Sequence, residues 1–272
     1  MKQKIPFGIP LFLLMLALLL VTVEEGAAGK DPGRKFFFFH PDSAQNNLSQ
    51  LKSQMDGLLS GAGLDLQFQP FNHFADFDTS LRQQKPAFQW VPEWYVAKYG
   101  EPLGLKRFLV AVRQGKSLYR KVLICSGRNR QNLQDLDGRT LAMTTLGPDG
   151  HIILRDILFT PLGLNDRGLT VVEVPKDSDA LLALMLGQVD LALVGEDNLD
   201  VLRRLNGAVD RNVVQMERTL PLPMPVLCYR QDSVPEEELN RMKDLFLQSP
   251  SRSGGREFME MLQIDAWQTI AH

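Results

Sequence analysis

Strand-like and helix-like segments alternate along this chain from residue 35 to residue 205, and this order limits its fold more than any other feature. Residues 35–39 contain an unbroken run of phenylalanines that ends at His40-Pro41, as in a buried strand. Between Leu48 and Leu59, apolar residues recur at the spacing of one helical face. Such alternation is typical of α/β proteins with mainly parallel sheets.

The later segments continue this pattern. Further strands are expected at residues 64–68, 87–90, 108–113, 119–125, 140–144, 170–174 and 189–194. Helices are expected from Phe74 to the break at Lys85-Pro86 and at residues 93–99, 151–158, 178–186 and 197–205. Residues 226–272 are expected to form one more strand and two helices.

Two crossings divide the pattern into two units. The alternation restarts after the polar residues 126–132 and stops before Pro221, Pro223 and Pro225. These prolines remove backbone donors, so their segment cannot form a helix or a central strand. We therefore expect an α/β protein of two doubly wound lobes joined by a hinge. The expected parts are a signal peptide at 1–28, a discontinuous first lobe at 29–126 plus 224–272, and a second lobe at 127–223.

The first 28 residues have the features of an export signal. Lys2 and Lys4 precede an apolar run from Leu11 to Val23, and the small residues Gly26 and Ala28 suit a cleavage site. The run is shorter than the ~20 residues that span a bilayer. Export to the periplasm with cleavage is expected, and an uncleaved signal anchor is the alternative.

Charge, cysteines and motifs exclude several classes of function. With 30 basic and 32 acidic residues, the chain lacks the basic excess of a nucleic-acid-binding protein. Cys125 and Cys228 lie in apolar runs, and they could form a disulfide or stay as two buried thiols. No G-x-S-x-G, H-E-x-x-H or G-x-x-x-x-G-K-[ST] motif is present, and the histidines lack metal-ligand spacing. We expect no catalysis, no cofactor and no metal.

Four segments carry a resemblance to a known family. They are Phe37-Phe38-Phe39-His40-Pro41, Trp90-Val91-Pro92-Glu93-Trp94-Tyr95, residues 132–139 with the pattern L-x-D-L-x-G-R, and residues 179–190 with D-A and a later G-x-x-D. Together they resemble the phosphonate-, phosphite- and phosphate-type periplasmic binding proteins of ABC importers, over roughly residues 35–263. The resemblance implies a type II periplasmic binding protein that closes on a small-molecule ligand and presents it to a membrane permease.

The sequence departs from this family where the family binds an oxyanion. Thr144 and Thr145 stand in the place of a hydroxyl-rich S-x-S-G loop, but Asp149 adds a negative charge there. Ser178 replaces the histidine of the family, and Asp177 precedes it. Because like charges repel strongly in a closed cleft, we expect a neutral or amphipathic ligand and not a simple phosphonate. Binding of a phosphonate- or phosphate-type oxyanion, and ligand sensing through a separate membrane partner, are the alternatives.

Candidate ligand-binding residues come from both expected lobes. Trp90, Trp94 and Tyr95 lie at a strand end beside Pro92, where α/β sheets bind ligands, although Trp90 and Tyr95 could equally pack in the core. The candidates of the second lobe are hydroxyl and carboxyl side chains near expected helix starts, namely Thr144, Thr145, Asp149, Ser178, Asp179 and Glu196. Helix capping is the alternative for the threonines, and solvation for Glu196.

Overall fold

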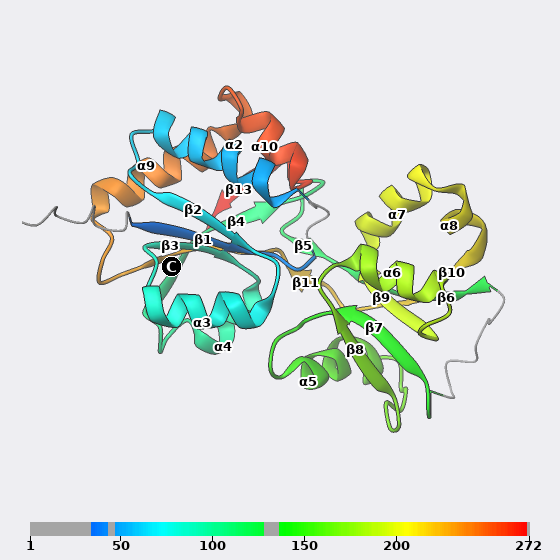
Figure 1. The fold of residues 1–272 in the computed structure, drawn as a ribbon. Coiled ribbons are helices and arrows are strands. Elements are labelled where there is room, and N and C mark those ends of the chain that lie inside the picture. The colour runs from blue at the N-terminus through cyan, green and yellow to red at the C-terminus, as the bar shows by residue number, and fades with distance from the viewer. Residues whose placement is uncertain (1–33, 43–46, 128–135, 271–272) are drawn as a thin grey trace, which may run out of the picture. The chain divides into compact units, whose positions relative to one another are not determined.

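The computed structural model describes residues 34–42, 47–127 and 136–270, and these form two α/β lobes, each built on its own sheet (Figure 1). The expected signal peptide and most of the polar segment before residue 136 lie outside the described residues. Among the described residues, no helix is both long and apolar enough to cross a membrane.

The sheet of the first lobe has six strands in the order β13-β4-β12-β3-β1-β2. β1 runs parallel to β2 and β3, whereas β12 runs antiparallel to β3 and β4, and β13 runs antiparallel to β4. In chain order the strands are β1 (Lys35–Phe39), β2 (Gln67–Phe71), β3 (Phe88–Val91), β4 (Leu105–Val112), β12 (Val226–Arg230) and β13 (Ala266–Thr269).

Helices cover both faces of this sheet, which explains the phenylalanine run of β1. Phe36 and Phe38 face a core that they share with three helices, while Phe37 and Phe39 face a second core on the opposite side. Alternate residues of a strand point to opposite faces, so a strand covered on both faces is apolar throughout. The first core contains α2 (Leu48–Gly61), α9 (Glu236–Leu247) and α10 (Gly255–Met261), and the second contains α3 (Phe74–Gln84) and α4 (Glu93–Tyr99).

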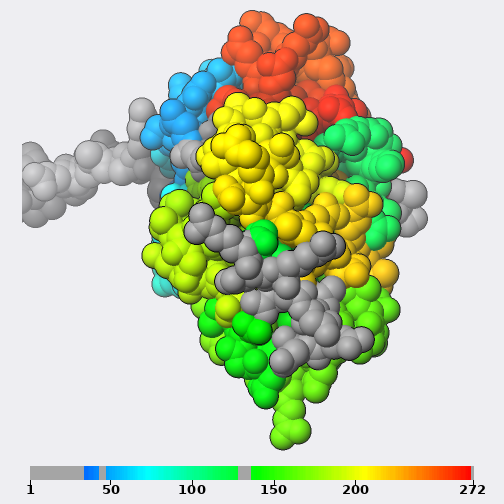
Figure 2. All heavy atoms as spheres, turned by 90° about the vertical axis from the view of Figure 1, so that its right-hand side faces the viewer, coloured from blue at the N-terminus to red at the C-terminus, as the bar shows by residue number. Residues whose placement is uncertain are grey.

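The sheet of the second lobe has five strands in the order β10-β6-β9-β7-β8. They are β6 (Lys121–Ser126), β7 (Thr140–Thr144), β8 (Thr170–Val174), β9 (Leu191–Gly195) and β10 (Val213–Arg218). One face packs against α6 (Asp177–Met185), α7 (Glu196–Leu205) and α8 (Gly207–Asn212). The other packs against α5 (Gly150–Leu154) and the π-helical turn Arg155–Phe159 that continues it. Figure 2 shows α7 and α8 in yellow at the surface of this lobe.

Two short strands lie where the chain crosses between the sheets. β5 (Leu118–Tyr119) and β11 (Leu222–Pro223) pair antiparallel, with Leu222 opposite Tyr119. We call this pair the hinge strands. The expected boundary at residue 126 is therefore too late, because β6 pairs with β9 and β10 of the second sheet. Residues 119–125 were expected as one strand, but Arg120 separates the hinge strand from β6.

The expectation of mainly parallel sheets is wrong. Among the described residues of the two larger sheets, β1, β2 and β3 pair in parallel, as do β7, β8 and β9, and the remaining pairs are antiparallel. The difference arises at the crossings. β12 and β6 enter their sheets from the hinge strands, so each runs against the neighbours that it joins.

Candidate functional site

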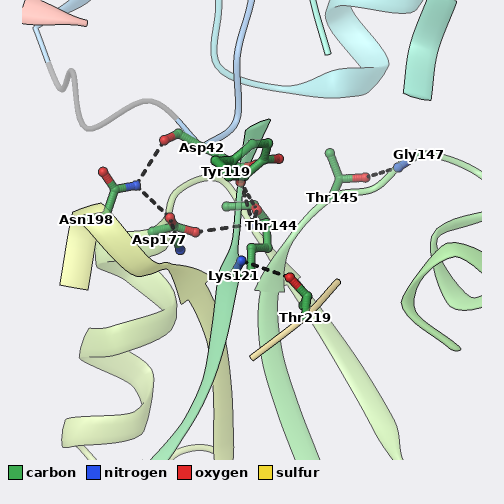
Figure 3. Close-up of polar contacts among 10 residues, drawn as sticks. Asp42, Tyr119, Lys121, Thr144, Thr145, Gly147, Asp177, Asn198 and Thr219 are labelled. Carbon is green, nitrogen blue, oxygen red and sulfur yellow. Dashed lines mark hydrogen bonds and ion pairs between the residues drawn. The ribbon is translucent and has the colours of Figure 1, made fainter. Parts of the chain in front are cut away.

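A buried polar cluster joins the two lobes beside the hinge strands (Figure 3). Asp42 follows β1 of the first lobe, and Tyr119 belongs to β5. In the second lobe, Lys121 opens β6, Thr144 ends β7 and Asp177 opens α6. Because β6 runs antiparallel to β9, its start lies at the same edge of the sheet as the end of β7, and α/β sheets bind ligands at the edge where parallel strands end.

Lys121 is the centre of this cluster. Its side chain is fully buried, and its Nζ lies 2.5 Å from Asp42 Oδ1, 2.6 Å from Thr144 Oγ1 and 3.6 Å from Asp177 Oδ1. The start of β6 is fixed by a bond from the Lys121 amide to the Thr219 hydroxyl (3.0 Å). A buried ammonium needs such partners, since an uncompensated charge costs several kcal/mol.

Asp42 brings a carboxylate of the first lobe to donors outside that lobe. The Thr144 hydroxyl donates to its Oδ1 at 2.5 Å, and the Tyr119 hydroxyl donates to its Oδ2 at 2.6 Å. The Asn198 amide donates to the Asp42 backbone carbonyl at 3.0 Å. With the contact to Lys121, both carboxylate oxygens and the backbone carbonyl of Asp42 accept hydrogen bonds from outside the first lobe.

Asp177 is held differently. Its Oδ2 accepts hydrogen bonds from the Gly195 amide and from Asn198 Nδ2, both at 2.7 Å. Its Oδ1 is buried without a hydrogen-bond partner. Asp177 therefore fixes the junction between β9 and α7, and its Oδ1 faces the Lys121 ammonium at 3.6 Å.

The pKa values of Asp42 and Asp177 are shifted in opposite directions. Burial alone would raise the pKa of Asp42, but Lys121, His40 and the hydrogen bonds from Lys121 and Thr144 lower it to about 2. Burial and the nearby Asp42 raise the pKa of Asp177. The pKa of Lys121 is raised because Asp177 and Asp42 outweigh its burial. Two carboxylates against one ammonium leave a surplus of one negative charge when all three are ionised.

His40 lies next to this cluster in its neutral form. It is buried, and burial lowers its pKa to about 4, with Arg113 and Lys121 acting in the same direction and Asp42 opposing them. Its Nδ1 has no hydrogen-bond partner. The histidine therefore supplies a neutral imidazole and no positive charge near pH 7.

A cavity of about 40 Å³ adjoins the cluster. It is lined from the first lobe by His40, Asp42, Pro92, Glu93 and Trp94, from the hinge strands and their neighbour by Tyr119, Leu222, Pro223 and Pro225, and from the second lobe by Leu146 and Ile153. We call this space the cleft. It has room for one or two water molecules but not for an organic molecule.

The aromatic candidates separate into one cleft residue and two core residues. Trp94 lines the cavity. Trp90 is fully buried and packs against Phe38 and Trp267, at ring-centroid distances of 5.0 and 4.8 Å. Tyr95 is also fully buried, and its hydroxyl donates to Asp78 at 2.8 Å. Trp90 and Tyr95 therefore pack in the core of the first lobe, which was the alternative that the sequence left open for them.

The threonine and aspartate candidates near α5 occupy three environments. Thr144 lies in the buried cluster. The Thr145 hydroxyl donates to Glu173 at 3.2 Å and accepts from the Gly147 amide at 3.0 Å, so it shapes the loop before α5. Asp149 is half exposed and forms an ion pair with Lys98 of the first lobe.

The candidates near α6 and α7 lie around the cluster. Ser178 and Asp179 are half-buried in the first turn of α6, next to the inward-facing Asp177. Glu196 pairs with Arg218 at 2.7 Å. Among the described residues, no group of three or more His, Cys, Asp or Glu side chains is arranged to hold a metal ion.

Sequence reasoning missed the cation of the site and its partners. Lys121 opens an apolar strand, where it resembles an ordinary edge residue, and Tyr119 precedes it. Asp42 and Asn198 were not among the candidates either. One available signal was that Asp42 closely follows the end of β1, at the edge of a sheet where ligands bind.

The comparisons with known proteins agree with this fold. One family model matches residues 36–272, and its description is "ABC transporter, phosphonate, periplasmic substrate-binding protein". No curated protein matches the chain.

Many solved structures have a similar fold. The binding-protein component of an ABC phosphonate transporter from Pseudomonas aeruginosa has a TM-score of 0.71 at 15% identity, covering 87% of this chain and 81% of that one. A Prochlorococcus marinus protein in complex with methylphosphonate has a TM-score of 0.72 at 11% identity, covering 87% and 92%. A Xanthomonas citri protein bound to ATP has a TM-score of 0.66 at 15% identity, covering 88% and 91%.

At these identities the solved structures establish the two-lobed fold, and the family model establishes the relationship. Members of this family are substrate-binding components of ABC transporters, and not enzymes. Their compartment is the periplasm. Because the match extends over residues 36–272, the chain belongs to the family of periplasmic substrate-binding proteins of phosphonate-type ABC transporters.

Proposed function

We propose that this chain is exported with cleavage of its signal peptide, captures a small neutral or amphipathic molecule between its lobes, and delivers it to a membrane permease. The family membership supports the transport role. The charges of the buried cluster favour this ligand class. The main support for a neutral or amphipathic ligand is that Lys121, the cation of the buried cluster, is already paired with Asp42.

The charge balance of the cluster disfavours a free oxyanion. Asp42 and Asp177 together outweigh Lys121, and His40 is neutral near pH 7. An added anion would lose its hydration and meet a surplus negative charge, which costs several kcal/mol. Since ~1.4 kcal/mol corresponds to a factor of ten, three such units would weaken binding about a thousandfold.

The rest of the cleft favours apolar contact. Trp94 of the first lobe lines the cavity together with Leu146 and Ile153 of the second. A ligand with an apolar part would bury its surface there at ~25 cal/mol per Å². Tyr119 also lines the cavity, and because its hydroxyl donates its proton to Asp42, the hydroxyl oxygen would accept a hydrogen bond from the polar part of the ligand. In this proposal Tyr95 positions Trp94 through packing, with the two ring centroids 5.9 Å apart.

Closure follows from the arrangement of the binding groups. A ligand that contacts Trp94 of the first lobe and Leu146 or Ile153 of the second touches both lobes, so its binding energy favours the closed state. The paired hinge strands are where the rotation would occur.

Calorimetry and small-angle scattering on the mature protein test the proposal. We expect inorganic phosphate and methylphosphonate to bind with dissociation constants above ~1 mM, which corresponds to about 4 kcal/mol. A thermal-shift screen of neutral and amphipathic compounds should yield a ligand that reduces the radius of gyration, and Trp94→Ala should weaken its binding.

The matched control is Tyr229→Ala, which removes an aromatic ring from β12 away from the cleft. Submicromolar binding of methylphosphonate to the wild type would overturn the proposed ligand class. A ligand of proven affinity that leaves the radius of gyration unchanged would overturn the closure mechanism.

Ligand sensing through a separate membrane partner is the second candidate. It is favoured by the similarity to a histidine kinase sensor domain, with a TM-score of 0.55 at 14% identity over 86% of this chain and 98% of that one. Reconstitution in vesicles, once with an ABC permease and once with a membrane histidine kinase, separates the two roles. Ligand uptake into vesicles supports transport, whereas ligand-dependent kinase activity without uptake supports sensing.

A further inference from the structure

We propose that Asp42 is a built-in anion, whose carboxylate occupies an oxyanion seat beside the cleft and thereby excludes phosphate-type ligands. The seat is formed by Lys121 Nζ, Thr144 Oγ1 and the Tyr119 hydroxyl. This inference rests on the proposed function and names the residue that would determine its ligand class.

The contacts of the Asp42 carboxylate are those of a bound anion. Lys121 Nζ and Thr144 Oγ1 lie 2.5 Å from one oxygen, and the Tyr119 hydroxyl lies 2.6 Å from the other. One ammonium and two hydroxyls are a donor set that also suits a phosphate or a phosphonate. All three donors converge on one carboxylate (Figure 3).

The donors and the carboxylate come from different parts of the fold. Lys121 and Thr144 belong to the sheet of the second lobe and Tyr119 to a hinge strand, whereas Asp42 follows β1 of the first lobe. The carboxylate therefore enters the seat from the opposite lobe, as a separate ligand would. Asn198 holds the Asp42 carbonyl at 3.0 Å and keeps this segment in place.

Asp177 does not make Asp42 redundant. Its Oδ1 lies 3.6 Å from Lys121 Nζ, which is longer than a hydrogen bond, and its Oδ2 is already bound by the Gly195 amide and by Asn198. Without the Asp42 side chain, Lys121 and the hydroxyls of Tyr119 and Thr144 would lose a shared acceptor. A small anion of similar charge could then restore these hydrogen bonds.

The alternative is that Asp42 serves only as a structural ion pair between the lobes. Both interpretations predict that Asp42→Ala lowers the melting temperature. They differ in how the variant responds to added anions, because a vacated seat binds anions, and a broken structural contact does not.

The decisive variant is Asp42→Ala in the full mature chain, studied by calorimetry and thermal denaturation at constant ionic strength. We expect it to bind inorganic phosphate or methylphosphonate at least ~10-fold more tightly than the wild type, which corresponds to one unit of ~1.4 kcal/mol. Acetate, which carries the deleted functional group, should raise the melting temperature of the variant but not that of the wild type.

Three controls assign the effect to the seat. Asp42→Asn keeps the space filled and should bind neither anion. Asp42→Ala combined with Lys121→Met should lose the gain, because the cation is removed. Asp232→Ala makes the same change of net charge in an exposed turn and should bind like the wild type.

The possible outcomes separate this inference from the proposed function. A folded Asp42→Ala protein that binds no anion and shows no acetate effect overturns the inference and leaves the proposed function standing. Tight binding of methylphosphonate to the wild type overturns both. If Asp42→Ala fails to fold, refolding with acetate supports the inference when it restores native protein and overturns it when it does not.

Discussion

At the scale of single residues, the site depends on buried groups whose protonation is set by their surroundings. His40 is the clearest case, because burial lowers its pKa to about 4, while an unfolded chain titrates near ~6.5. Between these values the unfolded state binds a proton that the folded state does not. The contribution of His40 to the free energy of unfolding is therefore complete above pH ~6.5 and falls as the pH decreases toward 4.

We expect His40→Gln to remove this pH dependence. The wild type should lose up to about 3 kcal/mol between pH ~6.5 and ~4 through this residue, whereas the variant should lose only what other groups contribute. Asp177 changes the free energy of unfolding in the opposite direction, because its pKa is raised. The contribution of Asp42 is lost mainly below pH ~4, because its pKa is lowered. Urea denaturation at several pH values gives the difference between the proteins, and equal slopes would contradict the prediction.

The candidates chosen from the sequence include some residues of the buried cluster and lack others for a definite reason. Thr144 was a candidate because it stands near an expected helix start, where the resembling family has a hydroxyl-rich loop. Lys121 was not, because its partners are far from it along the chain. Asp42 lies 79 positions before it and Thr144 lies 23 positions after it, and only the sheet topology brings the three together.

At the scale of elements, the loop before α5 meets the start of α4. Gly147 has a φ of +85°, and a Cβ at this position would lie 2.4 Å from Cζ3 of Trp94. Trp94 belongs to the first lobe and Gly147 to the second. The close approach therefore requires glycine for two reasons, the backbone conformation and the tryptophan ring.

We expect Gly147→Ala to destabilise the contact between α4 and this loop. The left-handed backbone alone costs ~1–2 kcal/mol, and displacement of Trp94 adds to it. In a Trp94→Ala background, the same substitution should cost only the backbone contribution. A double-mutant cycle from urea denaturation measures the coupling, and strictly additive costs would contradict the role of the ring.

Elements with strong local signals were predicted best. The strand over residues 35–39 and the helix over 93–99 have the expected bounds. β10 and β13 were not expected, because their pairing with β6 and β4 depends on distant strands and leaves no local periodic pattern. Trp90 and Tyr95 could not be assigned to core or cleft from sequence, since a strand end beside a proline suits both.

At the scale of the whole molecule, each lobe contains one cysteine. Cys125 lies in the second sheet and Cys228 in the first, and both are free and fully buried. Of the two possibilities that the sequence left open, the structure has the buried thiols. The two-lobed organisation itself could be predicted, because the strand–helix pattern restarts once along the chain.

We expect neither thiol to react with a thiol-specific reagent in the native protein, and both to react after unfolding. Burial also raises the pKa of the Cys228 thiol, which further suppresses the reactive thiolate. A reductant should leave the melting temperature unchanged. Absorbance of the released reagent anion counts the reactive thiols, and a count of zero in the denatured, unreduced protein would indicate a disulfide.

The position of β12 between β3 and β4 also bears on the order in which a growing or translocating chain can complete its lobes. All strands of the second sheet precede residue 219, whereas the first sheet lacks a central strand until residues 226–230 emerge. A chain that appears from its N-terminus can thus finish the second lobe while β3 and β4 still have open edges. Because open strand edges promote aggregation, we expect the first lobe to be more prone to aggregation than the second while the chain is incomplete.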